Sequence, residues 1–185
     1  MKKYIGKFAM FIFGWTWNIK IGSVPKKSVI VCAPHTSNWD FYFAVMGFWA
    51  LEIPIKVIIK DTHTKAWYGK IVEWMGGIGI DRKYSHDIVH NSANIIKNTD
   101  TIAFIITPEG TRKFSANWKK GFYFISKEAK VPIIAGIGDY KNKQCIVDTL
   151  IDPSNKSYEE VCDIMETIYK PEQAKYPEMY NPKIY

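Results

Sequence analysis

Short apolar runs rich in Val and Ile recur along the chain and are bounded by Pro, Gly, Asp or Asn. Such runs are typical of buried strands, because a strand covered on both faces has no polar side. The strands expected on this basis are 29–32, 55–59, 101–107, 131–137 and 144–150. The pattern therefore predicts a central β-sheet.

The segments between these runs predict helices, because apolar residues recur in them at helical spacing. The expected helices are 39–51, 64–75, 85–97, 118–130 and 157–169. Segment 39–51 is apolar on nearly every face, so it is expected either to be buried or to contact lipid. The helix at 157–169 opens with a capping box formed by Ser157 and Glu160.

The order of these elements predicts the fold class. Strands that alternate with helices indicate an α/β fold with a mainly parallel central sheet flanked by helices. The chain shows no internal repeat and no low-complexity linker, so residues 1–185 are expected to form a single domain. Residues 170–185 are rich in proline and tyrosine and predict an irregular tail.

The first twenty residues combine lysines with a run of aromatic and aliphatic side chains at 8–17. This run is too short to span a bilayer, which requires about twenty apolar residues. No small-residue cleavage site follows it, so a signal peptide is not indicated. Segment 1–20 predicts a helix at the membrane interface, with aromatic rings at headgroup level and lysines on anionic phosphates. The alternative is a helix that packs on the core, and both predict a cytoplasmic protein.

The composition limits the class of protein. A hydrophobic content of 47% with 15% aromatic residues excludes a disordered chain. The three cysteines are widely spaced, which indicates neither a disulfide framework nor a zinc site and fits a reducing compartment. The net charge of +7 implies an acidic partner. That partner would be nucleic acid, an anionic membrane surface, an acidic carrier protein or a phosphorylated substrate.

The end of the strand at 29–32 carries the first candidate for catalysis. His35 lies in the turn before the helix, and Asp40 lies about one turn inside it, so the imidazole and the carboxylate can meet. A carboxylate on one ring nitrogen fixes the tautomer and leaves the other nitrogen free to accept a proton. The pair therefore fits a general base with its orienting residue. Taken alone, the spacing also fits a helix-capping His and an ordinary first-turn acid.

A second turn with candidate ligands follows the strand at 101–107. It carries Glu109, Gly110, Thr111 and Arg112. Glycine permits a close approach of the backbone to a ligand, threonine offers a hydroxyl, and arginine offers a planar cation that matches a phosphate.

Together, these turns resemble the glycerophospholipid acyltransferase family, which includes the bacterial lysophosphatidic acid acyltransferases. The chain carries four blocks similar to those of the family, in the same order. They are His35 with Asp40 in the His-x4-Asp motif, GIGIDR at 77–82, PEGTR at 108–112 and VPIIA at 131–135. Gly79 stands where the family usually has a bulkier residue, and Ala135 stands where it usually has proline.

The resemblance implies a reaction and a set of roles. His35 would act as general base and Asp40 would orient it, while Arg82 with Arg112 would hold a phosphate. The other implied substrate-binding residues are Glu109, Gly110 and Thr111. The acyl group would pass from acyl-coenzyme A or an acyl carrier protein directly to the hydroxyl of lysophosphatidic acid or a related glycerophosphate, in phospholipid biosynthesis.

The resemblance also sets expectations for the surroundings of the site. Backbone N–H groups at the start of the helix would stabilise the oxyanion, and segment 39–51 would line a channel for the acyl chain. Neither a metal nor a cofactor is expected. The protein would lie peripherally on the inner face of the cell membrane, with an anionic membrane surface, a lysophospholipid acceptor and the acyl donor as its partners.

Other classes of protein remain open at this point. The chain fits an acyltransferase for a non-glycerophosphate lipid acceptor, or a non-catalytic protein that binds lipid or an anionic membrane. A metal-dependent hydrolase would use His35 and Asp40 as ligands, but the sequence lacks a convincing third ligand. His86 and His90 lie four residues apart on a predicted helix, but no HExxH motif or partnering cysteine accompanies them. A nucleic-acid-binding domain would leave Asp40 and Glu109 unexplained, so no nucleic acid partner is expected.

Overall fold

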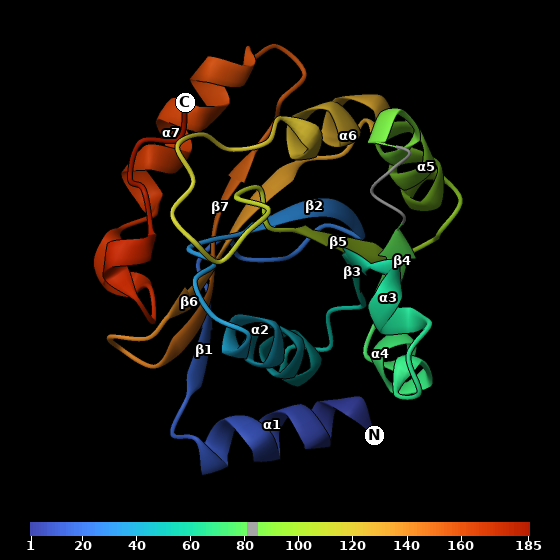
Figure 1. Cartoon of the computed structure of the whole chain (residues 1–185), viewed down its shortest axis with the longest axis vertical. Helices are drawn as coiled ribbons and strands as arrows, with labels where there is room; N and C mark the ends of the chain where they lie inside the picture. Colours follow the sequence, from blue (N-terminus) through green and yellow to red (C-terminus); the bar gives the residue numbers. More distant parts are fainter. Residues whose placement is uncertain (81–84) are drawn as a thin grey trace.

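A mixed seven-stranded sheet runs through the middle of the computed structural model, which describes residues 1–80 and 85–185 (Figure 1). The strand order is β1-β7-β6-β2-β5-β3-β4. The strands are β1 Thr16–Ile19, β2 Lys27–Cys32, β3 Ile55–Lys60, β4 Gly77–Ile80, β5 Ile102–Ile106, β6 Ile133–Asp139 and β7 Gln144–Ile151. Each neighbouring pair is parallel except β6 with β7, which is antiparallel. The prediction of a mainly parallel sheet is confirmed.

The central strand β2 lies between β5 and β6, and its side chains are buried on both faces of the sheet. Val29 and Val31 contribute to one hydrophobic core, whereas Ile30 contributes to the other. All three side chains are fully buried. This burial explains why the strand reads as an uninterrupted apolar run in the sequence.

Helices cover both faces of the sheet (Figure 1). Their bounds are α1 Lys2–Ile12, α2 Trp39–Ala50, α3 Asp61–Thr64, α4 Gly69–Trp74, α5 Ser85–Lys97, α6 Gly121–Ala129 and α7 Tyr158–Ile168. One face is covered by α2, with α1 lying beyond it, and the opposite face is covered by α5, α6 and α7. The nearly all-apolar character of α2 follows from its position between α1 and the sheet.

The N-terminal segment differs from the single helix that was expected over residues 1–20. The helix α1 ends at Ile12, and Gly14 follows with a φ of 67°, a left-handed conformation that favours glycine and ends helices. Trp15 is buried, and its ring stacks on that of Phe43 with 4.0 Å between the centroids. The strand β1 then pairs with β7 at one edge of the sheet. The aromatic run thus contains both a helix and a strand.

The helix expected over residues 64–75 is wrong, because the chain forms two short helices, α3 and α4, with a turn between them. Two glycines permit the close packing at this turn. A Cβ on Gly69 would lie 1.9 Å from the carbonyl oxygen of Thr64, and one on Gly79 would lie 2.1 Å from the Thr64 hydroxyl. The departure from the family pattern at Gly79 therefore has a local steric explanation.

The helix expected from residue 118 begins three positions later, at Gly121. The preceding N–H groups donate to distant carbonyls instead of extending the helix. Trp118 N donates to Ile184 O at 2.8 Å, and Lys119 N donates to Pro108 O at 2.9 Å. These bonds connect the start of α6 to both the C-terminal segment and the turn that follows β5.

The C-terminal segment 170–185 is largely irregular, and it packs on the domain. It contains two 3-10 helices, η2 Pro171–Gln173 and η3 Pro177–Met179. Ala174, Tyr180 and Ile184 are buried in the core on the α6 and α7 face. The expectation of an irregular tail thus overlooked two short turns of helix.

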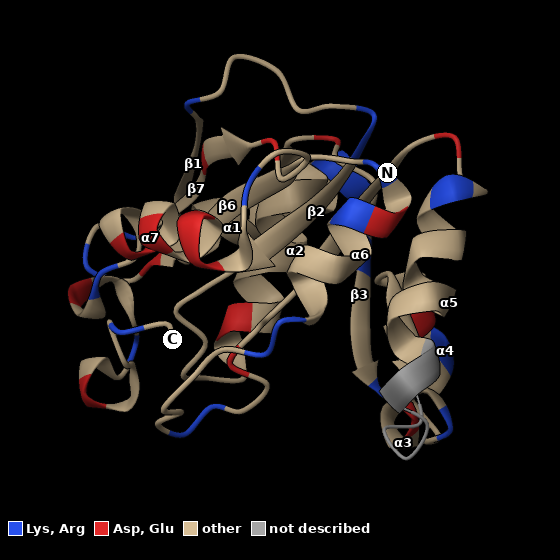
Figure 2. Cartoon of the chain, turned by 90° about the horizontal axis from the view of Figure 1, so that it is seen from above, with Lys and Arg blue, Asp and Glu red and all other residues tan. Residues whose placement is uncertain are grey.

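Charge is unevenly distributed over the surface (Figure 2). Acidic positions gather on α7, which contains Glu159, Glu160, Asp163 and Glu166. Lysines and arginines occur mainly in loops and near the ends of elements. Within the described ranges, the helices are all too short or too polar to cross a bilayer.

Candidate active site

The candidate functional side chains meet at the carboxyl edge of the sheet, where open α/β folds place their ligands. His35 follows β2, Thr107 follows β5, Lys60 ends β3, and Tyr140 follows β6. These four residues all line one cavity. The parallel arrangement of β2, β3, β5 and β6 thus brings together turns that are far apart in the sequence.

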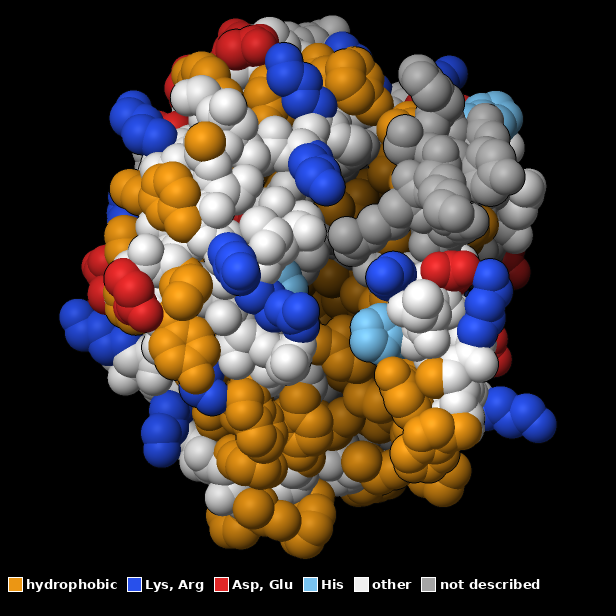
Figure 3. All heavy atoms as spheres, viewed as in Figure 1, with side chains coloured by type: hydrophobic (Ala, Val, Ile, Leu, Met, Phe, Trp, Pro, Cys, Tyr) orange, Lys and Arg blue, Asp and Glu red, His pale blue; other side chains and the backbone are white. Residues whose placement is uncertain are grey.

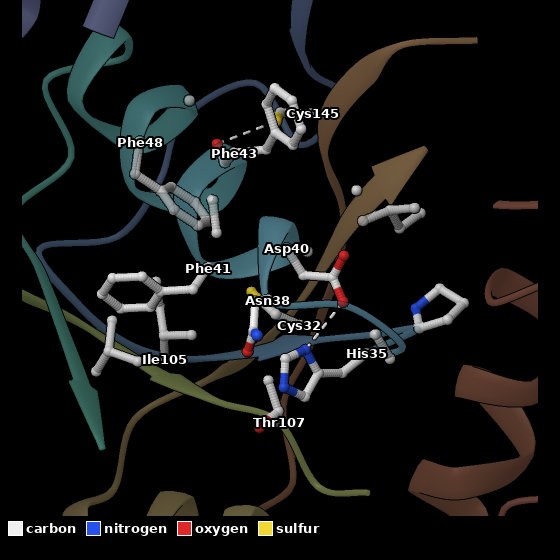
Figure 4. A pocket seen from close by; sticks show the side chains of 18 of the residues that line it. Cys32, His35, Asn38, Asp40, Phe41, Phe43, Phe48, Ile105, Thr107 and Cys145 are labelled. Carbon is white, nitrogen blue, oxygen red and sulfur yellow. Dashed lines mark hydrogen bonds and ion pairs between the residues drawn. The ribbon is translucent and has the colours of Figure 1, made fainter. Parts of the chain in front are cut away.

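His35 and Asp40 form the contact that the sequence predicts (Figure 4). Nδ1 of His35 lies 3.0 Å from Oδ2 of Asp40. A carboxylate can only accept, so the hydrogen is on Nδ1, and the Nε2 lone pair remains available to a substrate. The side chains are 19% and 14% exposed, so both are largely shielded from water while the imidazole stays accessible.

The turn before α2 directs backbone donors at the same carboxylate. Thr36 N and Ser37 N each donate to Oδ2 of Asp40 at 2.8 Å. Asp40 N itself donates to Ser37 O, and Trp39 N donates to the Ser37 hydroxyl. These N–H groups were expected to stabilise an oxyanion, but they are already engaged within the turn. The Thr36 and Ser37 amides hold the Asp40 carboxylate, and the other two bond to Ser37.

Tyr140 supplies a contact that the sequence did not reveal. Its hydroxyl donates to Oδ1 of Asp40 at 2.6 Å, across 100 positions of sequence. Burial, together with the hydrogen bond to Asp40, raises the pKa of Tyr140 above its usual value, so the phenol stays protonated. No local motif marks such a residue, because only the position of the β6–β7 turn brings it to Asp40.

Glu109 contacts the turn that carries His35 and is only 6% exposed. Both of its carboxylate oxygens lie 3.0 Å from the backbone N of His35, which donates to them. Burial raises the pKa of Glu109 to about 7, although the hydrogen bond from His35 opposes this shift. The substrate-binding role expected for Glu109 stays a prediction, and the structure adds a contact that supports the His35 turn.

The other residues of the PEGTR block lie at the mouth of the cavity. Gly110, Thr111 and Arg112 line it, and Arg112 donates to the side-chain oxygen of Asn38. Gly110 has a φ of 67°, and a Cβ at this position would lie 2.8 Å from the end of the Lys119 side chain. The positive φ is what requires glycine here, since the flexible Lys119 side chain could move away from a Cβ.

Arg82 lies outside the described residues, so its predicted role in phosphate binding stays a prediction. The structure adds two basic side chains that sequence reasoning did not assign to the site. Lys60 and His63 line the same cavity, after β3, the strand that follows β5 in the sheet order. No local motif marks Lys60, because only the place of β3 beside β5 in the sheet brings it to the site.

The cavity has a volume of about 640 Å³ and extends from His35 between α2 and the sheet. Its walls are mostly apolar. They include Phe41, Ala44, Phe48 and Leu51 of α2 together with Val57 and Ile59 of β3 and Ile105 of β5. Figure 4 shows Phe41, Phe48 and Ile105 together on one side of His35 and Asp40. The expectation that α2 would line a channel agrees with this geometry.

Two cysteines contribute to the cavity wall. Burial raises the pKa of Cys145 to about 12 and raises that of Cys32 further, so both thiols are neutral. Cys145 is also held by a 3.4 Å contact from its sulfur to the carbonyl oxygen of Phe43 (Figure 4). These thiols act as apolar packing and not as nucleophiles.

His86 and His90, the two histidines at metal-ligand spacing, both lie on α5. His90 Nδ1 lies 2.7 Å from Glu128 Oε1, whereas the side chain of His86 is outside the described part. Across the described residues, no three His, Cys, Asp or Glu side chains are grouped to hold a metal ion. The expectation of a metal-free site stays a prediction.

The site is thus a half-buried His–Asp pair that lines a mostly apolar cavity in an α/β fold. The sequence pattern of the acyltransferase family matches residues 19–136, which is more than half of the chain. The chain therefore belongs to the acyltransferase family. All four recognised blocks lie entirely within this match, and the family resemblance seen in the sequence is confirmed.

Two similar proteins have names that specify a substrate. The chain is 32% identical over 120 residues to a Mycoplasma pneumoniae protein named "Probable 1-acyl-sn-glycerol-3-phosphate acyltransferase". This alignment covers 60% of the chain and 44% of that protein, so the chain matches less than half of its relative's length.

The fold is similar to a crystal structure of the 1-acyl-sn-glycerophosphate acyltransferase from Thermotoga maritima. The TM-score is 0.63, and the match covers 90% of this chain and 74% of the other. The two sequences are 19% identical, so this comparison concerns the fold alone.

Proposed function

We propose that the protein transfers a fatty acyl group from an acyl thioester to the hydroxyl of lysophosphatidic acid or a closely related glycerophosphate. The observation that carries the proposal is the His35–Asp40 pair, 3.0 Å apart, at the mouth of a 640 Å³ apolar cavity. The name of the Mycoplasma pneumoniae relative, a probable 1-acyl-sn-glycerol-3-phosphate acyltransferase, supports the choice of acceptor.

The proposed reaction uses His35 as general base. Nε2 removes the proton of the acceptor hydroxyl while Nδ1–H donates to Asp40, which stabilises the imidazolium that forms. The acceptor oxygen then bonds to the thioester carbonyl carbon, the carbon–sulfur bond breaks, and the imidazolium returns its proton to the thiolate. Ser37 is the nearest alternative nucleophile, but its hydroxyl accepts from Trp39 N within the turn.

Basic side chains at the cavity mouth support a phosphate-bearing acceptor. Arg112 lies in the turn after β5 and Lys60 ends the neighbouring strand β3, and both line the cavity. A guanidinium binds phosphate through two parallel hydrogen bonds, and a lysine adds a point charge. In this proposal, Arg82 would complete the set.

A thioester oxyanion needs a donor other than the engaged amides of the catalytic turn. Asn38 lines the cavity beside His35, and its side-chain oxygen accepts from Arg112. Its side-chain amide nitrogen therefore points away from Arg112 and can donate to a bound substrate. We assign the oxyanion to this group, because a positioned side-chain amide is a common oxyanion donor.

The proposed location is peripheral, on the inner face of the cell membrane. Exposed apolar side chains gather below the cavity over α1, α2 and α4 (Figure 3). They include Tyr4, Phe8, Phe11 and Ile12 of α1, Trp39 of α2, and Trp67 and Ile71 near α4. Aromatic side chains beside lysines suit a lipid headgroup layer, and a lipid substrate would enter from there.

The experiment that tests the function measures free thiol released from palmitoyl-coenzyme A, with and without lysophosphatidic acid. The wild type should release thiol only when the acceptor is present. His35→Ala should reduce that release by about 10²–10⁴-fold, the usual contribution of a positioned base.

Three further outcomes separate the alternatives. Release from an acyl carrier protein alone would change the donor, whereas release with a phosphate-free lipid acceptor would change the acceptor class. No release with either donor, combined with tight binding of fatty acid, would replace the enzyme with a lipid-binding protein.

A further inference from the structure

Asp40 receives hydrogen bonds on both of its carboxylate oxygens, and the donors come from different parts of the chain. Oδ2 accepts from His35, Thr36 and Ser37, which all belong to the local turn. Oδ1 accepts from the Tyr140 hydroxyl at 2.6 Å. Donors on a single oxygen leave a carboxylate freer to turn about its Cβ–Cγ bond, so the fourth donor fixes its plane.

Tyr140 is itself held firmly by aromatic packing. Its ring makes edge-to-face contacts with Trp15 and Phe43, at centroid separations of 5.0 Å and 5.9 Å. Trp15 and Phe43 stack on each other, so the three rings form one cluster. Such contacts fix the direction of the phenol without using its hydroxyl.

The backbone of Tyr140 is held by the C-terminal segment 170–185. Tyr140 N donates to the carbonyl oxygen of Gln173 at 2.9 Å. Gln173 belongs to η2, and its side-chain oxygen accepts from Lys170 N at 2.8 Å. The position of Tyr140 is thus tied to a short, internally bonded turn.

The same segment also contacts the other side of the carboxylate. Tyr176 N donates to the hydroxyl oxygen of Thr36 at 3.2 Å. Thr36 is one of the residues whose backbone N–H donates to Oδ2 of Asp40. The segment therefore touches one partner of each carboxylate oxygen, and buried Ala174, Tyr180 and Ile184 anchor it to the core.

We propose that Tyr140 is a positioning residue for the His35–Asp40 pair and that segment 170–185 is the brace that holds it in place. This inference rests on the proposed acyl transfer for its kinetic consequence. It extends the site beyond residues 19–136, the part that matches the family, because Tyr140 and the brace both lie outside that range. Tyr140 acts through Asp40 and does not need to touch the substrate.

The first test is Tyr140→Phe, which keeps the ring in its aromatic cluster and removes the hydroxyl. Loss of a hydrogen bond to a charged group should lower kcat by roughly 10- to 100-fold, with KM for donor and acceptor within about 2-fold of wild type. The matched control is Tyr123→Phe. Tyr123 is buried on α6, on the other face of the sheet, and its hydroxyl donates to Lys156 O at 2.8 Å. The control should leave kcat unchanged.

A double variant distinguishes positioning from general destabilisation. If Tyr140 acts only through Asp40, Tyr140→Phe should cause little further loss of kcat in an Asp40→Asn background. If the losses instead multiply, Tyr140 acts independently of Asp40 and the proposal is overturned. Thr36→Val tests the brace itself, since it removes the acceptor of the Tyr176 amide with little change in shape. It should lower kcat with KM unchanged.

A measurement without substrate keeps the inference separate from the proposed function. The protein is labelled with ¹⁵N-histidine and studied by NMR. The chain has four histidines, and the signal that is missing in His35→Ala identifies His35. The Nδ1–H resonance of His35 should shift in Tyr140→Phe and Thr36→Val but not in Tyr123→Phe. Unchanged spectra in the first two would overturn the inference, even if acyl transfer is demonstrated. A shift without any acyl transfer would uphold the positioning role and reject the proposed reaction.

Discussion

The backbone amide of His35 lies 3.0 Å from both carboxylate oxygens of Glu109, which is almost completely buried. The two turns that carry the catalytic and PEGTR motifs are therefore joined by a charge-assisted hydrogen bond below the cavity mouth. Such a bond fixes the start of the His35 turn relative to the turn that follows β5. It also makes the stability of the site depend on pH.

Glu109→Gln should make the free energy of unfolding less dependent on pH. Burial raises the pKa of folded Glu109 to about 7 from the ordinary 4.5, so the folded protein holds a proton between these values that the unfolded chain has lost. The contribution of Glu109 thus favours folding at acidic pH and is lost as pH rises from about 4.5 to about 7. From pH 4 to pH 8, the variant should gain up to about 3 kcal/mol relative to wild type.

Urea unfolding of both proteins at several pH values measures this difference. Glu178→Gln, at an exposed position of η3, is the matched control and should follow the wild type. A Glu109→Gln variant whose stability relative to wild type is the same at pH 4 and pH 8 would show that the buried carboxyl does not titrate in this interval.

Arg112→Ala should raise KM for lysophosphatidic acid by about 10-fold or more, because it removes a charge-assisted phosphate contact at the cavity mouth. KM for a monoacylglycerol acceptor, which has no phosphate, should change little. Steady-state kinetics with both acceptors measure this selectivity. The neighbouring Lys113→Ala removes the same charge from an exposed position and should leave both KM values near wild type. Equal effects of Arg112→Ala on the two acceptors would rule out phosphate binding by Arg112.

The double variant Phe8→Ser and Phe11→Ser should weaken binding to anionic vesicles by at least 10-fold. These rings are 66% and 81% exposed on α1, and each would bury apolar area in the headgroup layer. Co-sedimentation with phosphatidylglycerol vesicles measures the bound fraction. Phe124→Ser is the control, because this ring is 49% exposed on α6 at the opposite side of the sheet. If the control weakens binding equally, α1 is not the membrane contact.

Local sequence patterns were enough to predict the central part of the site. The contact between His35 and Asp40 follows from a spacing of five residues across a strand-to-helix turn, and parallel strand ends bring Arg112 to the same edge. The uninterrupted apolar run of β2 correctly predicted a strand covered on both faces. These features depend on neighbours in sequence or on the strand order typical of the fold class.

Features set by distant contacts were not predictable in the same way. Tyr140 reaches Asp40 only because β6 lies next to β2 in the sheet, and Lys60 joins the site because β3 lies next to β5. The expected helix at 64–75 is interrupted between Thr64 and Gly69, where the close approach of the Gly69 backbone to the Thr64 carbonyl outweighed the apolar periodicity. The strand β1 was not predicted, because it follows α1 within one aromatic segment whose pattern favoured a helix throughout.

Gly6 fixes how α1 relates to the rest of the molecule. A Cβ at this position would lie 2.5 Å from Met46 O and 2.6 Å from Ala50 N, so the backbones of α1 and α2 are in direct contact. Since α2 begins immediately after the turn with His35, the two packed helices connect the exposed aromatic face of α1 to His35. A surface bound by α1 would therefore have a fixed distance and orientation relative to the imidazole of His35. If α1 rests on the membrane as proposed, binding there would also set the position of His35, so that membrane binding and alignment of the proposed base would occur together.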